Sequence, residues 1–301
     1  MNTRTKTFLS CLVICAALPS CKGGGNTAKA AICSEMNKII EEVRAQYAPD
    51  PRDEVCEITV SQEDGKPVLR GVVTEAATKA ALIKRARAVR PEVVDSICLL
   101  PAKALGDKLY GIADVSVADL RTGPGYAKEM ATQTLLGMAM HVLQEKEGWY
   151  RVRTPEGYLA WIEGGTMTLL TKDSLNAWIS APKVIYTADY GFAYEKPDAQ
   201  GGRISDLVFG DLLKREGESG GFYQVAFPDG RQGYVPRREC EDFEAWTKSR
   251  ELSGEGIVKT ALSLQGIPYS WGGTSEKAMD CSGFAKTVNL HHGIMLRRDA
   301  S

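Results

Sequence analysis

A weak internal repeat constrains the fold of this 301-residue chain more than any other feature of its sequence. The segment EGWYRVRTPEGYLAWI, residues 147–162, is echoed by GGFYQVAFPDGRQGYVP, residues 220–236. Upstream of these segments, Gly137 and Gly210 repeat the same offset of 73 positions. Short strands separated by Gly- and Pro-containing turns at such a period are typical of small β-barrels. The repeat therefore predicts two consecutive barrel domains.

Both repeats resemble bacterial SH3-type domains, the first more closely than the second. In the first copy, ADLRTGP at residues 118–124 matches the opening of that family, and GYLAWI matches its closing strand. In the second copy, GYVP at residues 233–236 matches the closing strand. The resemblance predicts one SH3-type barrel over residues 105–172 and another over residues 183–246.

The segment before the repeat, residues 33–104, has the pattern of a small α+β domain. Met36, Ile39, Ile40 and Val43 recur at helical spacing, and the next stretch alternates apolar and polar residues around an Asp-Gly-Lys turn. An alanine-rich helix and a closing strand complete the pattern. It resembles the envelope-associated BON-type domains, and a spacer domain of no assigned family is the alternative.

Residues 1–21 are expected to form a lipoprotein signal peptide. The apolar run at residues 8–18 is too short to span a bilayer but has the length of a secretory signal. It ends in LPSC, which resembles the lipobox of bacterial lipoproteins and implies lipidation of Cys21. Residues 22–32 are then a flexible tether. The expected location is the periplasmic side of the bacterial cell envelope, with a membrane anchor. Plain secretion and a cytoplasmic hydrophobic helix are the alternatives.

Charge and cysteine spacing argue against two classes of partner. The chain has 37 basic and 38 acidic residues, so no nucleic-acid partner is expected. No pair of cysteines has CxxC spacing, and the histidines lie far from Cys33 and Cys56, so no metal or other cofactor is expected. In an oxidising compartment Cys56 and Cys98 can form a disulfide. Two free thiols are the alternative.

The stretch YSWGGTSEKAMDCSGF, residues 269–284, has the pattern that leads to a nucleophilic cysteine. Asp280 is a plausible N-cap for a helix that begins at Cys281. The positive end of a helix dipole favours a thiolate, and free backbone amides there can stabilise an oxyanion. We expect Gly283, one turn into the helix, to leave the backbone open to substrate. A buried, inert Cys281 is the alternative.

The motifs GIPYSWGG, DCSGF and LRRDAS resemble those of the NlpC-type cell-wall peptidases, which are papain-like cysteine enzymes. The match covers residues 250–301, the N-terminal part of a papain-like α+β catalytic domain. Together with two SH3-type barrels, it resembles the dipeptidyl-peptidase-like γ-D-glutamyl-L-diamino acid endopeptidases. The predicted fold is therefore multidomain α+β. The implied substrates are peptidoglycan stem peptides or muropeptides with a free N-terminal L-alanine.

The resemblance also implies roles for individual residues. Cys281 is the nucleophile, and Tyr269 borders the oxyanion and substrate. Substrate contacts are implied for Asp280, Ser282, Asp299, Glu129 and Tyr158, with Arg298 as a structural partner. Simpler interpretations stay open: Asp280 as a cap only, Tyr269 as a packing residue, Glu129 as a solvated carboxylate and Tyr158 as a core residue.

A catalytic base is missing from this pattern. In the family the histidine lies on a strand roughly 50 residues beyond the cysteine, past the end of this sequence. His141 falls in the first barrel, and His291 and His292 are about 15 Å along the helix from Cys281 at ~1.5 Å per residue. A base must come within about 3 Å of its nucleophile. We therefore expect a chain cut inside its catalytic domain and inactive alone. The alternatives are a non-catalytic peptidoglycan-binding envelope lipoprotein and an acyl- or amidotransferase.

Overall fold

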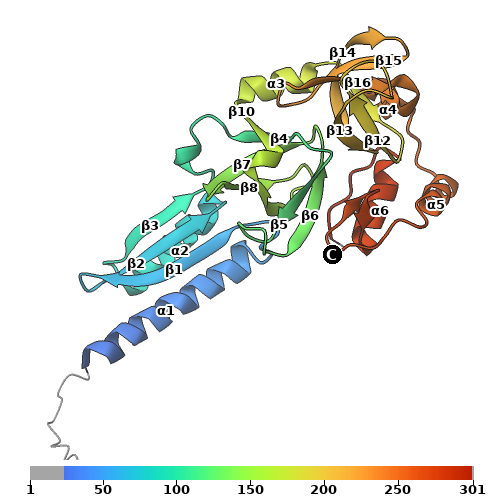
Figure 1. The fold of residues 1–301 in the computed structure, drawn as a ribbon. Coiled ribbons are helices and arrows are strands. Elements are labelled where there is room, and N and C mark those ends of the chain that lie inside the picture. Colours follow the sequence, from blue (N-terminus) through green and yellow to red (C-terminus); the bar gives the residue numbers. More distant parts are fainter. Residues whose placement is uncertain (1–23, 300–301) are drawn as a thin grey trace, which may run out of the picture.

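The structure, a computed structural model, describes residues 24–299. The expected signal peptide and Cys21 lie outside these residues. Figure 1 shows a helix–sheet unit at the N-terminal side, two β-sheet units, and a small C-terminal segment packed beside them. This is a mixed α+β architecture. Among the described helices, none is both long and apolar enough to cross a membrane.

The N-terminal unit is a three-stranded sheet with two helices on one face. Its elements are α1 (Gly24–Tyr47), β1 (Cys56–Glu63), β2 (Lys66–Val73), α2 (Ala76–Val89) and β3 (Val94–Leu99). Strands β1 and β2 form an antiparallel hairpin whose turn residues Asp64 and Gly65 have positive φ. Strands β2 and β3 are parallel, and α2 supplies the crossover that parallel strands need.

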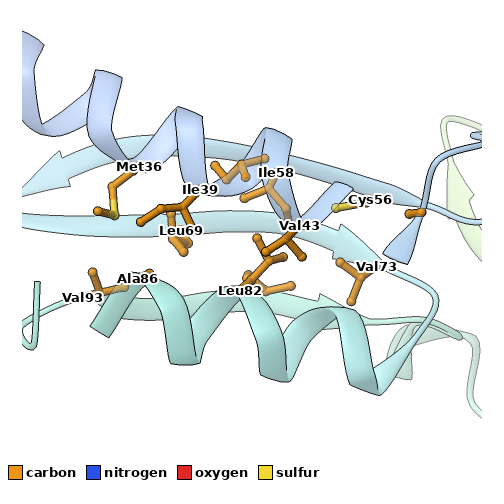
Figure 2. Packing of buried hydrophobic residues seen from close by; sticks show 13 residues of the cluster. Met36, Ile39, Val43, Cys56, Ile58, Leu69, Val73, Leu82, Ala86 and Val93 are labelled. Carbon is orange, nitrogen blue, oxygen red and sulfur yellow. The ribbon is translucent and has the colours of Figure 1, made fainter. Parts of the chain in front are cut away.

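Apolar side chains of both helices meet the sheet in one core (Figure 2). Met36, Ile40 and Val43 of α1 and Leu82 of α2 are at most 2% exposed. Burial at this helical spacing follows the apolar pattern in the sequence. The start of α1 differs from the sequence prediction, because the helix begins at Gly24, inside the predicted tether. The alanines of this stretch, the strongest helix formers, account for the difference.

Cys56 and Cys98 do not form the disulfide that the sequence allows; both are free. Cys56 lies opposite Val73, whereas Cys98 lies opposite Val72. Successive side chains of a strand point to opposite faces, so the two thiols lie on opposite faces of the sheet. Cys56 is buried in the helix-covered core, and Cys98 is exposed.

The first repeat forms a seven-stranded antiparallel sheet with the order β10-β4-β7-β8-β9-β5-β6. Its strands are β4 (Tyr110–Ala113), β5 (Val117–Arg121), β6 (Met130–Leu135), β7 (Ala139–Lys146), β8 (Trp149–Arg153), β9 (Leu159–Glu163) and β10 (Met167–Leu170). The short 3-10 helix η1 (Lys103–Leu105) precedes β4, and η2 (Gly164–Thr166) lies between β9 and β10.

The second repeat forms another seven-stranded sheet, ordered β13-β12-β16-β15-β14-β11-β17. Its strands are β11 (Lys183–Tyr186), β12 (Tyr190–Tyr194), β13 (Arg203–Val208), β14 (Leu212–Ser219), β15 (Phe222–Ala226), β16 (Gln232–Pro236) and β17 (Cys240–Asp242). Helix α3 (Lys172–Ser180) precedes it, and η3 (Arg237–Glu239) and α4 (Phe243–Ser249) close it.

The two sheets have the same topology. Adding seven to each strand number of the first sheet and reversing the list gives the order of the second. Even the irregularities repeat, because the bulge at Val142 in β7 recurs at Arg215 in β14, 73 positions later. Gly137 and Gly210, which the sequence paired, both have positive φ. The repeat seen in the sequence is therefore a structural duplication.

The C-terminal segment contains α5 (Gly254–Ser263), β18 (Thr274–Ser275), β19 (Ala278–Met279) and α6 (Cys281–Leu290). Leu264, Met279 and Val288 form its small core. The two β-sheet units meet at Leu136 and Asp211: the amide of Leu136 donates to the Asp211 carboxylate, and the amide of Leu212 donates to the Leu136 carbonyl. The C-terminal segment rests mainly against strand β6 of the first sheet.

Candidate active site

Cys281 is the first residue of helix α6 and is exposed. Asp280 caps this helix, since its carboxylate accepts the amide of Gly283 at 2.7 Å. The Asp280 carbonyl accepts the amide of Phe284. In the described part of the chain, the amides of Cys281 and Ser282 have no acceptor. The thiol therefore lies beside free N–H donors at the positive end of the helix dipole.

A buried ion pair fixes the cap. Arg298 donates to Asp280 at 2.5 Å, and the two side chains are 2% and 6% exposed. The amide of Gly272 donates to the same carboxylate oxygen at 2.9 Å. Burial alone would raise the pKa of Asp280, but the hydrogen bonds from Arg298, Gly283 and Gly272 outweigh it and lower that pKa. Asp280 is thus a buried carboxylate that holds the start of α6 in place.

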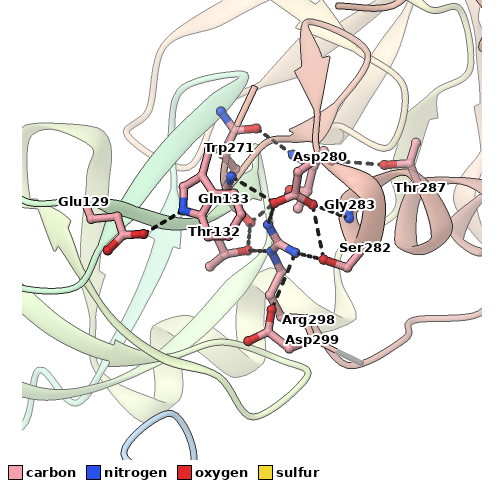
Figure 3. Close-up of polar contacts among 12 residues, drawn as sticks. Glu129, Thr132, Gln133, Trp271, Asp280, Ser282, Gly283, Thr287, Arg298 and Asp299 are labelled. Carbon is pink, nitrogen blue, oxygen red and sulfur yellow. Dashed lines mark hydrogen bonds and ion pairs between the residues drawn. The ribbon is translucent and has the colours of Figure 1, made fainter. Parts of the chain in front are cut away.

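Arg298 joins three parts of the site (Figure 3). Besides Asp280, its guanidinium donates to the hydroxyl of Ser282 at 2.5 Å and to the hydroxyl of Thr132 at 3.1 Å. Thr132 belongs to strand β6 of the first sheet and is fully buried. The last described residues of the chain therefore connect the helix of Cys281 to the first β-sheet unit.

Gly283 has a different role from the one predicted. It is buried, and a Cβ at this position would lie 1.9 Å from the carbonyl oxygen of Gly273. The glycine is needed because the helix packs directly on the loop backbone, not because substrate approaches there. Gly272, with φ +80°, has a similar constraint, since a Cβ would meet the carbonyl of Met130 at 2.7 Å.

Strand β6 also supports the loop before Cys281. The side-chain carbonyl of Gln133 accepts the amide of Thr274 at 2.9 Å, and its amide group donates to Asp119 at 3.0 Å. The hydroxyl of Thr287 in α6 donates to the Thr274 carbonyl (Figure 3). Gln133 was not predicted, because nothing in its own neighbourhood distinguishes it from a surface residue of a strand.

Each histidine is occupied away from Cys281. His291 stacks on Phe209 with ring centroids 3.5 Å apart, and its Nε2 lies 3.2 Å from Glu276. His292 contacts the hydroxyl of Thr260 in α5 and the carbonyl of Glu251, just before α5. His141 packs against a tyrosine within the first sheet. The structure thus places no described histidine at the thiol.

Comparisons with known proteins bear on the same two regions. Residues 120–164 match the family model of the bacterial dipeptidyl-peptidase SH3 domain, and residues 266–301 match that of the NlpC/P60 family. The chain is related to the NlpC/P60 dipeptidyl-peptidases. This confirms the family predicted from the PYSWGG and DCSGF motifs. It also supports the SH3-type nature of the first β-sheet unit.

Similar proteins of this family have been named by activity. The chain is 26% identical over 184 residues to a γ-D-glutamyl-L-lysine dipeptidyl-peptidase of Bacillus cereus, covering 58% of this chain and 54% of that protein. It is 28% identical over 199 residues to dipeptidyl-peptidase 6 of Lysinibacillus sphaericus, covering 64% and 73%. The chain therefore spans about half of the Bacillus cereus protein.

A crystal structure of an NlpC/P60 family protein from Bacillus cereus has the same fold over the shared part. The TM-score is 0.55 at 22% identity, and the match covers 63% of this chain and 74% of that one. At this identity the likeness concerns the fold alone. It agrees with a mixed α+β fold for this chain.

Tyr269 and Trp271 lie on the exposed side of the NlpC/P60 segment. Tyr269 is 65% exposed and Trp271 61% exposed, although both are large aromatic residues. The indole of Trp271 donates to Glu129 of the SH3-type unit at 2.8 Å (Figure 3). Trp271 was not among the predicted site residues. The sequence places Trp271 in the PYSWGG motif, but it gives no sign of the contact with Glu129, 142 positions earlier.

Asp299 and Tyr158 line one pocket, of about 40 Å³. Glu129, the partner of Trp271, does not line this pocket. Burial and the Asp299 carboxylate raise the pKa of Tyr158 to about 12. Arg52 of the N-terminal unit reaches into this pocket and donates to Asp299 at 2.8 Å. The structure thus brings Asp299 and Tyr158 together and holds Glu129 with Trp271. The participation of Arg52 was not predicted.

Proposed function

We propose that this protein is a cysteine endopeptidase that hydrolyses the γ-D-glutamyl-L-diamino acid bond of peptidoglycan stem peptides. The observation that carries the proposal is the exposed thiol of Cys281 at the start of α6, beside two free amides and a cap locked by Arg298. The name of the Bacillus cereus relative, a γ-D-glutamyl-L-lysine dipeptidyl-peptidase, supports the same substrate class.

The proposed reaction begins with the thiolate of Cys281. Its sulfur attacks the γ-carbonyl carbon of D-glutamate, and the free amides at the start of α6 donate hydrogen bonds to the resulting oxyanion. The amine of the diamino acid leaves with a proton, and water then hydrolyses the thioester. Tyr269, exposed beside the same helix, borders the oxyanion and substrate.

We assign recognition of the substrate's N-terminal L-alanine to the surface of the SH3-type unit that carries Glu129. Glu129, held by Trp271, supplies a carboxylate for the free α-amino group. An ammonium withdrawn from water needs such a partner, because leaving it unpaired costs several kcal/mol. Asp280, Ser282, Asp299 and Tyr158 complete the proposed contacts. Asp280 has a structural role in addition, because its carboxylate accepts from Arg298 and from two amides.

Proton transfer needs a base that the three histidines of this sequence do not supply, since all of them are engaged elsewhere. We therefore propose that the 301-residue chain alone does not turn over. A non-catalytic, peptidoglycan-binding role for the two β-sheet units is the second candidate, favoured by the same observation. The lipoprotein anchor at Cys21 and the periplasmic location remain part of the proposal.

The test uses L-Ala-γ-D-Glu-L-Lys and mass-spectrometric detection of the released L-Ala-γ-D-Glu. We expect binding without release by the 301-residue chain, and release when a histidine-bearing remainder of an NlpC/P60 domain is joined after Ser301. Cys281→Ala in the joined protein abolishes release and keeps binding. Release by the 301-residue chain would overturn the proposal about the base. Release by the joined Cys281→Ala variant would overturn the assignment of the nucleophile.

A further inference from the structure

The loop between α1 and β1 of the N-terminal unit, residues 48–55, reaches the pocket that Tyr158 and Asp299 line. Three residues of this loop line the same pocket: Asp50, Arg52 and Asp53. The carbonyl of Arg52 accepts the amide of Leu159 at 2.8 Å, so the loop is attached to the start of β9, next to Tyr158. The N-terminal unit lies outside both segments that match family models, so those matches do not account for this contact.

Arg52 is paired with one of the proposed substrate contacts. Its Nη1 donates to the Asp299 carboxylate at 2.8 Å. Its Nε and Nη2 donate to Asp50 at 2.9 Å and 2.6 Å, and this double contact holds the guanidinium in place. A carboxylate that a stem peptide would have to reach is therefore already bound to a cation of the protein itself.

The remaining acidic residues of the pocket are paired as well. Asp53 pairs with Arg297, and Glu156 pairs with Lys286 of α6. The free space of about 40 Å³ holds roughly three water molecules, at about 15 Å³ for each. Among the described residues, the pocket thus offers neither room for an amino-acid residue nor an unpaired carboxylate.

We propose that Arg52 is a gate: the loop that carries it closes this end of the substrate site and must move before a stem peptide binds. The inference rests on the proposed function, because it takes Tyr158 and Asp299 as substrate contacts. The side chains of the Arg52–Asp299 pair are 44% and 32% exposed. Exposed pairs of this kind contribute little and are screened by salt, so an entering peptide can displace the guanidinium. Arg52 then keeps its contacts with Asp50.

The experiment measures binding of L-Ala-γ-D-Glu-L-Lys to the 301-residue chain by calorimetry at low ionic strength. Arg52→Met removes the guanidinium that competes for Asp299. We expect this variant to bind the peptide about threefold to fivefold more tightly than the wild type, which is the effect of one exposed ion pair. Arg70→Met is the matched control, because Arg70 also forms an exposed ion pair in the N-terminal unit, with Glu63, but does not line the pocket. Its affinity should equal that of the wild type.

Two further measurements distinguish a gate from a structural role of Arg52. In an Asp299→Asn background the guanidinium has no carboxylate to pair with at this position, so Arg52→Met should no longer raise the affinity. High salt should reduce the gain in the same way, because it screens the exposed pair that closes the gate. A structural role of Arg52 predicts neither result.

The outcomes separate this inference from the proposed function. Arg52 is 44% exposed, so we expect Arg52→Met to fold, and a circular dichroism melt checks this. Wild-type binding with equal or weaker binding by Arg52→Met would overturn the gate and leave the proposed function intact. So would a gain of affinity that persists in the Asp299→Asn background. Absence of binding by both the wild type and Arg52→Met would overturn the gate together with the proposed function.

Discussion

Arg298 and Asp280 form a buried ion pair at 2.5 Å that joins the end of the described chain to the residue before Cys281. The pair is 18 positions apart in sequence, and each member also binds a third element: Arg298 binds Thr132 of the first sheet, and Asp280 binds the amide of Gly272. The position of the thiol therefore depends on a contact that a helix cap alone would not provide.

Replacing Arg298 by Met tests this dependence. The substitution leaves the Asp280 carboxylate buried without its partner, and breaking a buried pair in this way costs about 3–5 kcal/mol. We expect a lower thermal transition and faster hydrogen exchange of α6, with the N-terminal unit unaffected. Arg297→Met is the control, because Arg297 is exposed and its guanidinium pairs with Asp53. Unchanged exchange in α6 would show that the cap holds without the ion pair.

The same pair predicts a dependence of stability on pH. The pKa of Asp280 in the folded chain lies below its ordinary value of 3.8. The stabilisation from this carboxylate is therefore complete above that ordinary value and is lost as the pH falls through the lower, folded-state pKa. We expect the difference in unfolding temperature between the wild type and Asp280→Asn to shrink as the pH falls below about 4. A difference that stays constant down to pH 2 would contradict this.

The repeat and the capped helix that begins at Cys281 could be predicted from sequence because both depend on local patterns. The alternation of apolar and polar residues and the turn residues of each repeat predicted the two sheets. The short motif around Cys281 predicted a capped helix N-terminus. Even the offset between Gly137 and Gly210 corresponds to the same turn in both sheets. These features are set by neighbours in sequence, which is what periodicity and capping rules describe.

Contacts between units could not be predicted in this way. Gln133 binds Thr274, and Arg52 binds Asp299 from 247 positions away, so neither residue has a local signal of its role. Gly283 was misinterpreted for the same reason: its neighbour, the Gly273 carbonyl, is visible only once the loop is folded against the helix. Side-chain partners across units depend on tertiary packing, which a single sequence does not specify by pattern.

Gly283 gives a direct test of this packing. Because an added Cβ would lie 1.9 Å from the Gly273 carbonyl, Gly283→Ala forces the helix and loop apart. We expect a loss of about 1–3 kcal/mol, as for overpacked cores. Gly254→Ala in α5 is the matched control, since nothing lies within 4 Å of its added methyl group. Circular dichroism melts of both variants compare the two. Equal melting temperatures would exclude the close approach at Gly283.

Thiol reactivity distinguishes Cys281 from the other cysteines. Cys281 and Cys98 are exposed, whereas Cys56 and Cys240 are buried, and burial raises the pKa of both buried thiols. Iodoacetamide labelling followed by peptide mapping should modify Cys281 first, because its exposed thiol lies beside free amides at the positive end of the α6 dipole. Cys98 should follow, and the two buried thiols should react only on unfolding. Labelling of Cys281 no faster than Cys98 would mean that the helix end does not activate the thiol.

Glu129 is the residue to which we assign recognition of the substrate's free amino group. Glu129→Gln keeps an acceptor for the indole of Trp271 but removes the charge that would face an ammonium. In a Cys281→Ala background, we expect binding of L-Ala-γ-D-Glu-L-Lys to weaken about tenfold or more, because a charge-assisted contact is lost. Binding of the N-acetylated peptide, which we expect to be weak in the unsubstituted protein too, should not change. Glu147→Gln, in the exposed turn between β7 and β8, is the control with no expected effect. Calorimetry measures the binding affinity for both peptides. An equal loss of affinity for both would mean that Glu129 only positions Trp271 and does not bind the amino group.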